Sequence, residues 1–327
     1  MKSRICQYFL NNVVYFLIDN FLTPIILLTF PFISDKIKIN VFIKKVFLMY
    51  MLLKDGKKRV LTLSYDDGVI QDRRLIEIMN KHGLKGTFNI NSGLYLPEKE
   101  TYKNPGKRRL KLSDAKELYI GSGHEIAIHG LNHKFMERLP KTEMIKETIS
   151  DRLNLEKDFG GIVRGMAYPY GTWNEELSDV LDSCGIVYSR TTLSTENFDF
   201  PKNWLTLNPT CHHNNPRLME LAEQFIKEER YSRSRMFYLW GHAYEFDDND
   251  NWYIIEKFAE YMGGRDDIWY ATNIEIYNYV KAYENLILSA DCSAVYNPSS
   301  VDVWIDTGGI DTGDTVCVRA GETIRLK

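Results

Sequence analysis

The chain has 327 residues, of which 44% are hydrophobic, so it can bury one large core or two medium ones and lacks the composition of a disordered protein. Its formal net charge at pH 7 is -3 with acids and bases interspersed, which gives no electrostatic reason to expect nucleic acid or an anionic membrane surface as a partner. The five cysteines lie far apart, which argues against a disulfide framework or a zinc ribbon and favours a reducing compartment.

Residues 1–50 differ from the rest of the chain because they are rich in Phe, Ile, Leu, Val and Tyr. The window 13–33 is long enough to span a bilayer, but it contains Asp19, and a charge inside the bilayer is costly. Two interpretations stay open. Either this segment anchors the protein in a membrane, or translation begins at Met49 or Met51 and the protein is cytoplasmic.

Short apolar or β-branched runs alternate with longer amphipathic stretches over most of the chain, which is typical of strands joined by crossover helices. Many such units in succession indicate a mainly parallel sheet or barrel. The expected strands are residues 59–67, 85–91, 125–130, 165–170, 186–192, 204–210, 236–242 and 268–273.

Apolar residues at helical spacing predict the helices between these strands. After residue 288 the pattern changes to short alternating runs separated by glycines, such as 301–305 and 315–318, which predicts a small β appendage. We therefore divide the chain into an apolar N-terminal segment (1–50), a barrel (51–288) and a β appendage (289–327). The expected helices are residues 71–82, 141–157, 175–183, 217–229, 252–262 and 274–283.

Two adjacent carboxylates, Asp66 and Asp67, end the first apolar run and are followed by Gly68, which allows a tight turn. Ligands of a parallel barrel bind at the carboxyl ends of its strands, so these side chains are candidate functional groups. The alternative is that they cap a helix starting near Val69.

Histidines end two further apolar runs. His129 is followed four residues later by His133, a spacing that suits two imidazoles on one ion but also arises by coincidence. His242 ends the run 236–242, where the alternative is a core histidine with satisfied hydrogen bonds. Pro169 and Tyr170 end another run, and either a sugar platform or simple packing would explain them.

One aspartate and two histidines together make a three-ligand site with open coordination positions, as expected of a catalytic metal. Zinc fits this ligand set best, and the ligand types also suit cobalt, manganese or nickel. Such an ion polarises a carbonyl and lowers the pKa of a bound water, which leaves two proton transfers to nearby groups. Asp66 and His242 can supply those groups.

With these motifs in this order, the chain resembles the polysaccharide deacetylase family, carbohydrate esterase family four. The matching motifs are Tyr-Asp-Asp-Gly at 65–68, His-x-x-x-His at 129–133, Pro-Tyr-Gly at 169–171 and Trp-Gly-His at 240–242. The resemblance implies an α/β fold, an irregular (β/α) barrel, here with a small C-terminal β appendage. It also implies a divalent metal and an acetylated carbohydrate substrate.

The resemblance assigns roles to individual residues. Asp66 is implied as the general base and His242 as the general acid. The implied metal ligands are Asp67, His129 and His133. The implied substrate-binding residues are Tyr170, whose backbone N–H stabilises the oxyanion in the family, together with Pro169 and Trp240.

The chain departs from the family pattern at Ala167, which stands where the family usually has an arginine that orients the base. Arg164 or Arg190 could take its place.

The Asp-Trp pair that usually supplies the partner of the acidic histidine is also missing, so Asp199, Glu245 or Asp247 would have to serve. The run Cys211-His212-His213 could add a substrate contact or a further ligand, or could hold ordinary loop histidines.

The predicted activity is removal of the N-acetyl group from an N-acetylated sugar. Two alternatives use the same metal site: hydrolysis of an O-acetyl ester, as in xylan, or of a small non-sugar amide. A third is a carbohydrate-binding protein on a decayed enzyme scaffold. No nucleic acid partner is expected, and a membrane only if residues 1–50 form an anchor.

Overall fold

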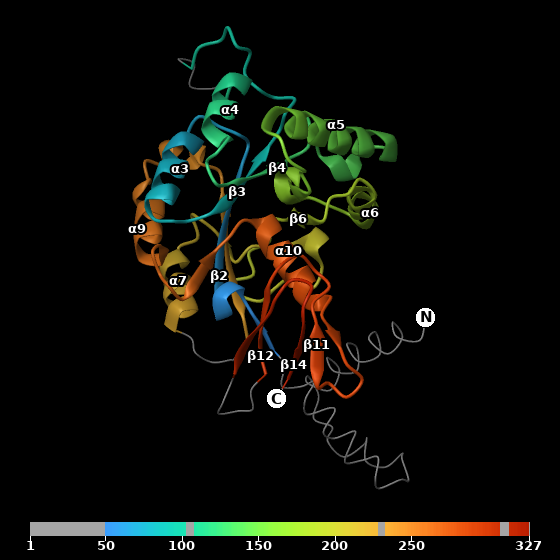
Figure 1. The fold of residues 1–327 in the computed structure, drawn as a ribbon. Coiled ribbons are helices and arrows are strands. Elements are labelled where there is room, and N and C mark those ends of the chain that lie inside the picture. Colours follow the sequence, from blue (N-terminus) through green and yellow to red (C-terminus); the bar gives the residue numbers. More distant parts are fainter. Residues whose placement is uncertain (1–49, 103–107, 228–232, 308–313, 327) are drawn as a thin grey trace. The chain divides into compact units, whose positions relative to one another are not determined.

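The computed structural model describes residues 50–102, 108–227, 233–307 and 314–326 (Figure 1). Leu48–Lys327 forms one compact unit. Within the described ranges, none of the helices combines the length and the apolar composition needed to cross a membrane. The predicted segment 13–33 lies outside the described residues.

An eight-stranded sheet forms the centre of the molecule, in the order β6-β5-β4-β3-β2-β8-β7, with β9 also paired to β2. All of these neighbours are parallel, and the strands are buried on both faces, which is why they are nearly continuous apolar runs. The strands are β2 (Arg59–Asp66), β3 (Gly86–Ile90), β4 (Glu125–Ile128), β5 (Gly165–Ala167), β6 (Tyr188–Arg190), β7 (Cys211–His212), β8 (Arg235–Gly241) and β9 (Ile268–Tyr270).

The sheet curls, but its end strands β6 and β7 do not pair with each other. A strand was expected between them at 204–210, and it does not form. This prediction is wrong: Trp204–Thr206 is a 3-10 turn (η5), and extended chain follows it. Leu207 N donates to Ser189 O and Leu207 O accepts from Thr191 N, so this chain bridges the open edge at β6. The predicted irregular (β/α) barrel is confirmed, with this segment as its irregular part.

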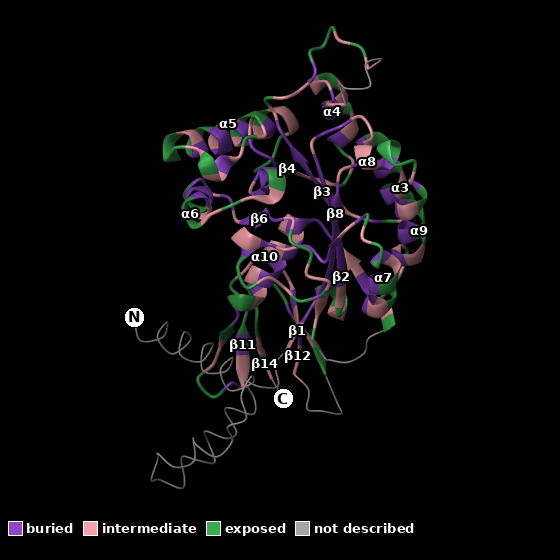
Figure 2. Ribbon diagram, turned by 180° about the vertical axis from the view of Figure 1, so that it is seen from behind, coloured by how far each residue is buried: buried purple, intermediate pink, exposed green. Residues whose placement is uncertain are grey.

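Helices cover the outside of the sheet, with α3, α7 and α9 on one side and α5 and α6 on the other (Figure 1). Buried residues gather in the strands, and exposed residues on the outer faces of helices such as α3 and α5 (Figure 2). The helices are α3 (Asp72–Lys81), α4 (Leu112–Tyr119), α5 (Lys141–Phe159), α6 (Glu175–Ser183), α7 (Leu218–Lys227), α8 (Tyr244–Asp248), α9 (Tyr253–Met262) and α10 (Asn273–Glu284). Short 3-10 turns lie at η2 (Lys54–Gly56), η3 (Met136–Arg138) and η4 (Pro169–Gly171).

The first helix of the barrel does not start where the capping alternative requires. It starts at Asp72, whose carboxylate accepts a hydrogen bond from Val69 N at 3.0 Å. Gln71 is the N-cap residue and makes no side-chain capping bond, so neither Asp66 nor Asp67 caps α3. The two carboxylates are therefore left for another purpose.

Two small antiparallel sheets form the appendage, as the alternating runs after residue 288 predicted. One contains β10 (Ile287–Leu288), β11 (Ala294–Tyr296) and β14 (Thr323–Arg325). The other contains β1 (Tyr50–Leu52), β12 (Val303–Asp306) and β13 (Thr315–Val318), so a strand from before the barrel joins the C-terminal appendage.

Tyr279 on α10 ties the appendage to the barrel. Its hydroxyl donates to Leu52 O at 2.7 Å and accepts from Trp304 N at 3.0 Å. Tyr279 is buried, so these backbone groups have little access to water that could replace it.

We expect Tyr279→Phe to lower the free energy of unfolding by about 1–3 kcal/mol, because it leaves a buried carbonyl and a half-buried N–H without a partner. Urea unfolding followed by circular dichroism measures the change. Tyr277→Phe is the matched control on the same helix, since its hydroxyl bonds to none of the described residues. Equal effects of the two variants would contradict this account.

Candidate active site

The predicted functional side chains meet at the carboxyl edge of the barrel. Asp66 ends β2 and Asp67 follows it, His129 follows β4, and His242 follows β8. His133 returns to the same place because the chain turns at Gly130, where φ is 72°. These strands are neighbours or near neighbours in the sheet, which is why distant parts of the sequence meet here.

Asp67, His129 and His133 present their ligand atoms to one another, all within 4.8 Å. Asp67 Oδ1 lies 3.7 Å from His133 Nε2 and 3.9 Å from His129 Nε2. Asp67 Oδ1 is itself buried and has no hydrogen-bond partner among the described residues. A buried carboxylate oxygen without an aligned hydrogen-bond donor beside two imidazoles is compatible with a metal site.

The tautomer of His129 also suits a metal. Its Nδ1 lies 2.7 Å from Ala167 O, a carbonyl that can only accept, so Nδ1 carries the proton and the Nε2 lone pair faces Asp67. Burial lowers the pKa of His129 to about 4, although Asp66 and Asp67 raise it, so the ring is neutral near pH 7. Burial also lowers the pKa of His133. The residues present therefore fit the divalent ion that the resemblance implies.

The loop between the two histidines is braced from outside. On α5, Asp151 accepts from His129 N at 3.1 Å, and Glu147 accepts from Asn132 N at 2.8 Å. This support is needed because the non-glycine residues Asp67, His133 and Tyr170 have φ values of 88°, 52° and 59°. Such left-handed backbone is costly and persists where surrounding contacts determine it.

Arg109 is a member of the site that the sequence did not reveal. Its Nη2 lies 2.8 Å from Asp67 Oδ1 in an ion pair that lacks the alignment of a hydrogen bond. Its Nη1 donates to Asp67 O and, at 2.7 Å, to Asn91 Oδ1. Arg109 comes from a loop 42 residues after Asp67, and no motif marks it.

Asp66 is fully enclosed and paired with Arg190, which donates to Asp66 Oδ2 through Nη2. Asn89 Nδ2 donates to Asp66 Oδ1 at 2.9 Å. Burial raises the pKa of Asp66, but Arg190 and the neighbouring histidines outweigh burial and lower it to about 2. Asp66 is therefore ionised near pH 7.

Arg190 occupies the place of the missing family arginine from the adjacent strand. In the β5–β6 pairing, Arg190 lies directly opposite Ala167, the residue where the family usually has its arginine. Arg164, the other candidate, has no ion pair or side-chain hydrogen bond with the residues that the structure describes. Of the two open candidates, the structure brings Arg190 to Asp66.

We expect Arg190→Met to lower the free energy of unfolding of the metal-free protein by about 3–5 kcal/mol, because it leaves the buried Asp66 carboxylate without its counter-charge. Chemical denaturation measures this. Arg164→Met is the matched control and should change stability by no more than about 0.5 kcal/mol. If the two variants lost equal stability, the ion pair would not be the main support of Asp66.

Glu245 is the carboxylate that meets His242. His242 Nδ1 lies 3.2 Å from Glu245 Oε1, and its Nε2 lies 3.8 Å from Asp66 Oδ2. Asp199 is exposed, and Asp247 bonds to Gln71 and Trp252. Burial lowers the pKa of His242, but its hydrogen bond to Glu245 and the charges of Asp66 and Asp67 outweigh burial and raise it.

The predicted substrate residues lie in different surroundings. Tyr170 is 51% exposed, and its ring stacks on Phe135 with centroids 3.8 Å apart and meets the edge of His133 at 4.5 Å. Pro169 is buried. Trp240 is only 8% exposed, and the Arg190 guanidinium covers its ring at 4.4 Å. Tyr170 is therefore the member of this group with a half-exposed aromatic ring beside the candidate metal ligands.

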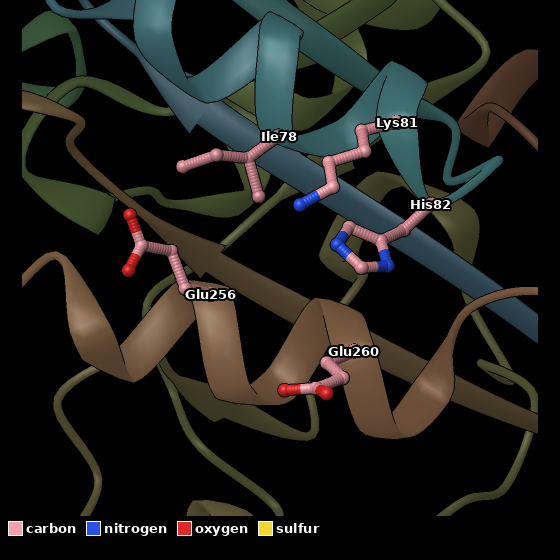
Figure 3. A pocket seen from close by; sticks show the side chains of 5 residues that line it. All are labelled: Ile78, Lys81, His82, Glu256 and Glu260. Atoms are coloured by element: carbon pink, nitrogen blue, oxygen red, sulfur yellow. The ribbon is translucent and has the colours of Figure 1, made fainter.

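A cavity of about 320 Å³ lies between α3 and α9, away from these residues (Figure 3). None of the candidate metal ligands lines this cavity. Its lining residues are Ile78, Lys81, His82, Glu256 and Glu260.

The parallel barrel thus carries an Asp-His-His cluster, a candidate metal centre, at its carboxyl edge. The family model for polysaccharide deacetylase matches residues 53–189, which include Asp66, Asp67, His129 and His133. This match confirms the resemblance to the polysaccharide deacetylase family. The class of activity that the family implies is hydrolytic deacetylation.

Solved structures of similar fold are known. A protein from Mycobacterium smegmatis assigned as a polysaccharide deacetylase is 16% identical, with 72% of this chain and 94% of that chain covered and a TM-score of 0.51. A deacetylase from Streptococcus pyogenes in complex with acetate is 22% identical, with 44% and 61% covered and a TM-score of 0.38. A family 4 carbohydrate esterase from Streptomyces lividans, also with acetate, is 16% identical, with 65% and 91% covered and a TM-score of 0.40. The Mycobacterium smegmatis structure supports the barrel fold. No curated protein matches the chain in sequence.

Proposed function

We propose that this protein is a divalent-metal-dependent deacetylase that hydrolyses the acetamide of an N-acetylated sugar. The observation that carries the proposal is the meeting of two groups at one edge of the barrel. Three candidate ligands, Asp67, His129 and His133, lie within 4.8 Å of one another. Asp66 and His242 stand beside them, with His242 Nε2 3.8 Å from Asp66 Oδ2.

Asp66 acts as the general base. Asp67, His129 and His133 would hold a divalent ion, zinc fitting best, which would supply Lewis acidity to an acetyl carbonyl and lower the pKa of a water. Asp66 is ionised near pH 7 because Arg190 lowers its pKa to about 2, so it can take the proton that the attacking water releases. Arg190 and Asn89 also hold the carboxylate in place.

His242 acts as the general acid. Its raised pKa favours the protonated form, and Glu245 accepts from Nδ1, so Nε2–H faces the reacting centre. As water oxygen bonds to the acetyl carbon, the carbon–nitrogen bond breaks and His242 protonates the departing nitrogen. The backbone N–H of Tyr170 donates to the oxyanion. The products are acetate and a free amino sugar.

The surroundings favour a carbohydrate as substrate. The half-exposed ring of Tyr170 lies against His133 and offers a flat apolar surface of the kind on which pyranose faces pack. The chain carries no large excess of charge that would select a highly charged ligand.

Two aspartate variants separate metal binding from proton transfer. Asp67→Asn should lose the ion of this site and the activity together, because it removes a charged ligand. Asp66→Asn should keep the metal content of the unmodified chain while turnover falls about 10²- to 10⁴-fold, the usual contribution of a general base. Metal analysis and acetate release from N-acetylglucosamine oligomers measure both.

The matched control for both variants is Asp182→Asn, which removes an exposed carboxylate on α6 outside the site. It should change neither metal content nor turnover. Full activity of Asp66→Asn would show that another group is the base.

Substrate choice is tested by offering the full-length protein chitooligosaccharides and acetylated xylan side by side. The proposal predicts faster acetate release from the amide. Faster release from xylan would make the protein an O-acetyl esterase on the same site. Tight metal binding with no release from either would favour a small non-sugar amide or a carbohydrate-binding role.

A further inference from the structure

A second group of potential ligands lies beside the first, on the far side of His242. It comprises His212 on β7, His213 directly after it, His242, and Glu245 on α8. The ligand atoms of His212, His242 and Glu245 lie within 4.8 Å of one another. The proposed reaction uses His242 and the support of Glu245 but gives no role to His212 or His213.

The distances within this cluster are short. Glu245 Oε2 lies 3.0 Å from His212 Nε2 and 3.0 Å from His213 Nε2, and Glu245 Oε1 lies 3.2 Å from His242 Nδ1. Two donors bound about 2.1 Å from one ion at ordinary angles lie roughly 3.0–3.4 Å apart. The separations to Glu245 are therefore compatible with the ligand shell of a transition metal as well as with hydrogen bonds.

Three imidazole nitrogens converge on the Glu245 carboxylate. Glu245 Oε2 is buried and has no aligned hydrogen-bond partner among the described residues, although two imidazole nitrogens lie 3.0 Å away. His213 is 0% exposed, and neither of its ring nitrogens has an aligned partner in the same part of the chain. Buried polar atoms without aligned hydrogen-bond partners are uncommon in folded proteins, and a bound ion would give these atoms a partner.

The barrel wall is shaped to admit His213. A Cβ on Gly241 would lie 2.0 Å from His213 Nδ1, so only glycine leaves room for this ring. The ring stacks between Tyr65, at 5.8 Å, and Phe246, at 4.1 Å.

We propose that His212 Nε2, His242 Nδ1 and the Glu245 carboxylate form a second divalent-cation site, with His213 beside it as a fourth polar group. Nitrogen-rich donors with one carboxylate suit zinc or cobalt. The His212 side chain is 22% exposed, which gives the ion a path from solvent. An ion on Nδ1 of His242 takes the place of the proton that Glu245 accepts there, so ion binding at this second site and the acid role that the proposed function gives His242 exclude each other.

Binding has one local consequence at His212. In the metal-free chain, Asn214 N donates to His212 Nδ1 at 3.1 Å, so the ring proton is on Nε2. An ion on Nε2 moves that proton to Nδ1 and breaks this bond. Asn214 is exposed, so water can take the place of the lost partner.

The test is the number of Co²⁺ ions that the chelator-treated, full-length protein takes up, measured by elemental analysis after dialysis. The unmodified chain should bind two equivalents. His212→Gln and Asp67→Asn should each bind one, and the double variant none. Glu245→Gln should reproduce His212→Gln, and circular dichroism reports whether each variant is folded.

His82→Gln is the matched control, because His82 is also a half-buried histidine but lies in the separate cavity between α3 and α9 (Figure 3). It should still bind two equivalents. One equivalent in the unmodified chain, lost in Asp67→Asn, would overturn the second site and leave the cluster as a hydrogen-bonded brace for His242. Two equivalents in His212→Gln would overturn it as well. One equivalent that survives Asp67→Asn but not His212→Gln would uphold this inference and refute the metal of the proposed function.

Discussion

The buried ion pair between Asp66 and Arg190 is the interaction on which the candidate site depends. A buried carboxylate without a counter-charge costs several kcal/mol, so the fold must bring the guanidinium to it. The pairing of Arg190 with Ala167 across β5 and β6 sets its position. Trp240 on β8 covers the guanidinium at 4.4 Å. Because Asp67 is the next residue along the chain, the register that satisfies Asp66 also places a candidate ligand.

Residues with strained backbone lie close to this ion pair, and contacts from other parts of the chain hold them in place. Asp67, His133 and Tyr170 have left-handed backbone, which costs on the order of 1–3 kcal/mol each. The compensating contacts come from outside the motifs: Arg109 binds the backbone and carboxylate of Asp67, and α5 braces the histidine loop. Asp55, Glu196, Asp250 and Cys292 have the same backbone elsewhere in the described chain, so the site holds three of the seven described non-glycine residues with positive φ.

The sequence predicted what local chemistry determines and missed what depends on distant contacts. Apolar runs located the strands of the barrel with two exceptions. The two-residue strand β7 was not predicted. The strand predicted at 204–210 does not form, because Trp204 and Leu207 are apolar for another reason: they pack in a core cluster with Tyr188 and Tyr238. The Asp-Asp-Gly and His-x-x-x-His motifs marked residues that the structure brings together, because strand ends of a parallel barrel share one edge. Arg190 and Glu245 could be named only among alternatives, and Arg109 not at all, since cross-strand register and loop paths leave no local pattern.

The most direct test of the proposed metal-dependent deacetylase activity is acetate release from N-acetylglucosamine oligomers by the full-length protein, before chelation, after it, and after zinc, cobalt or manganese is returned. The account predicts that release stops on chelation and resumes with at least one of these ions. Release that continues undiminished in fully metal-depleted protein would contradict it.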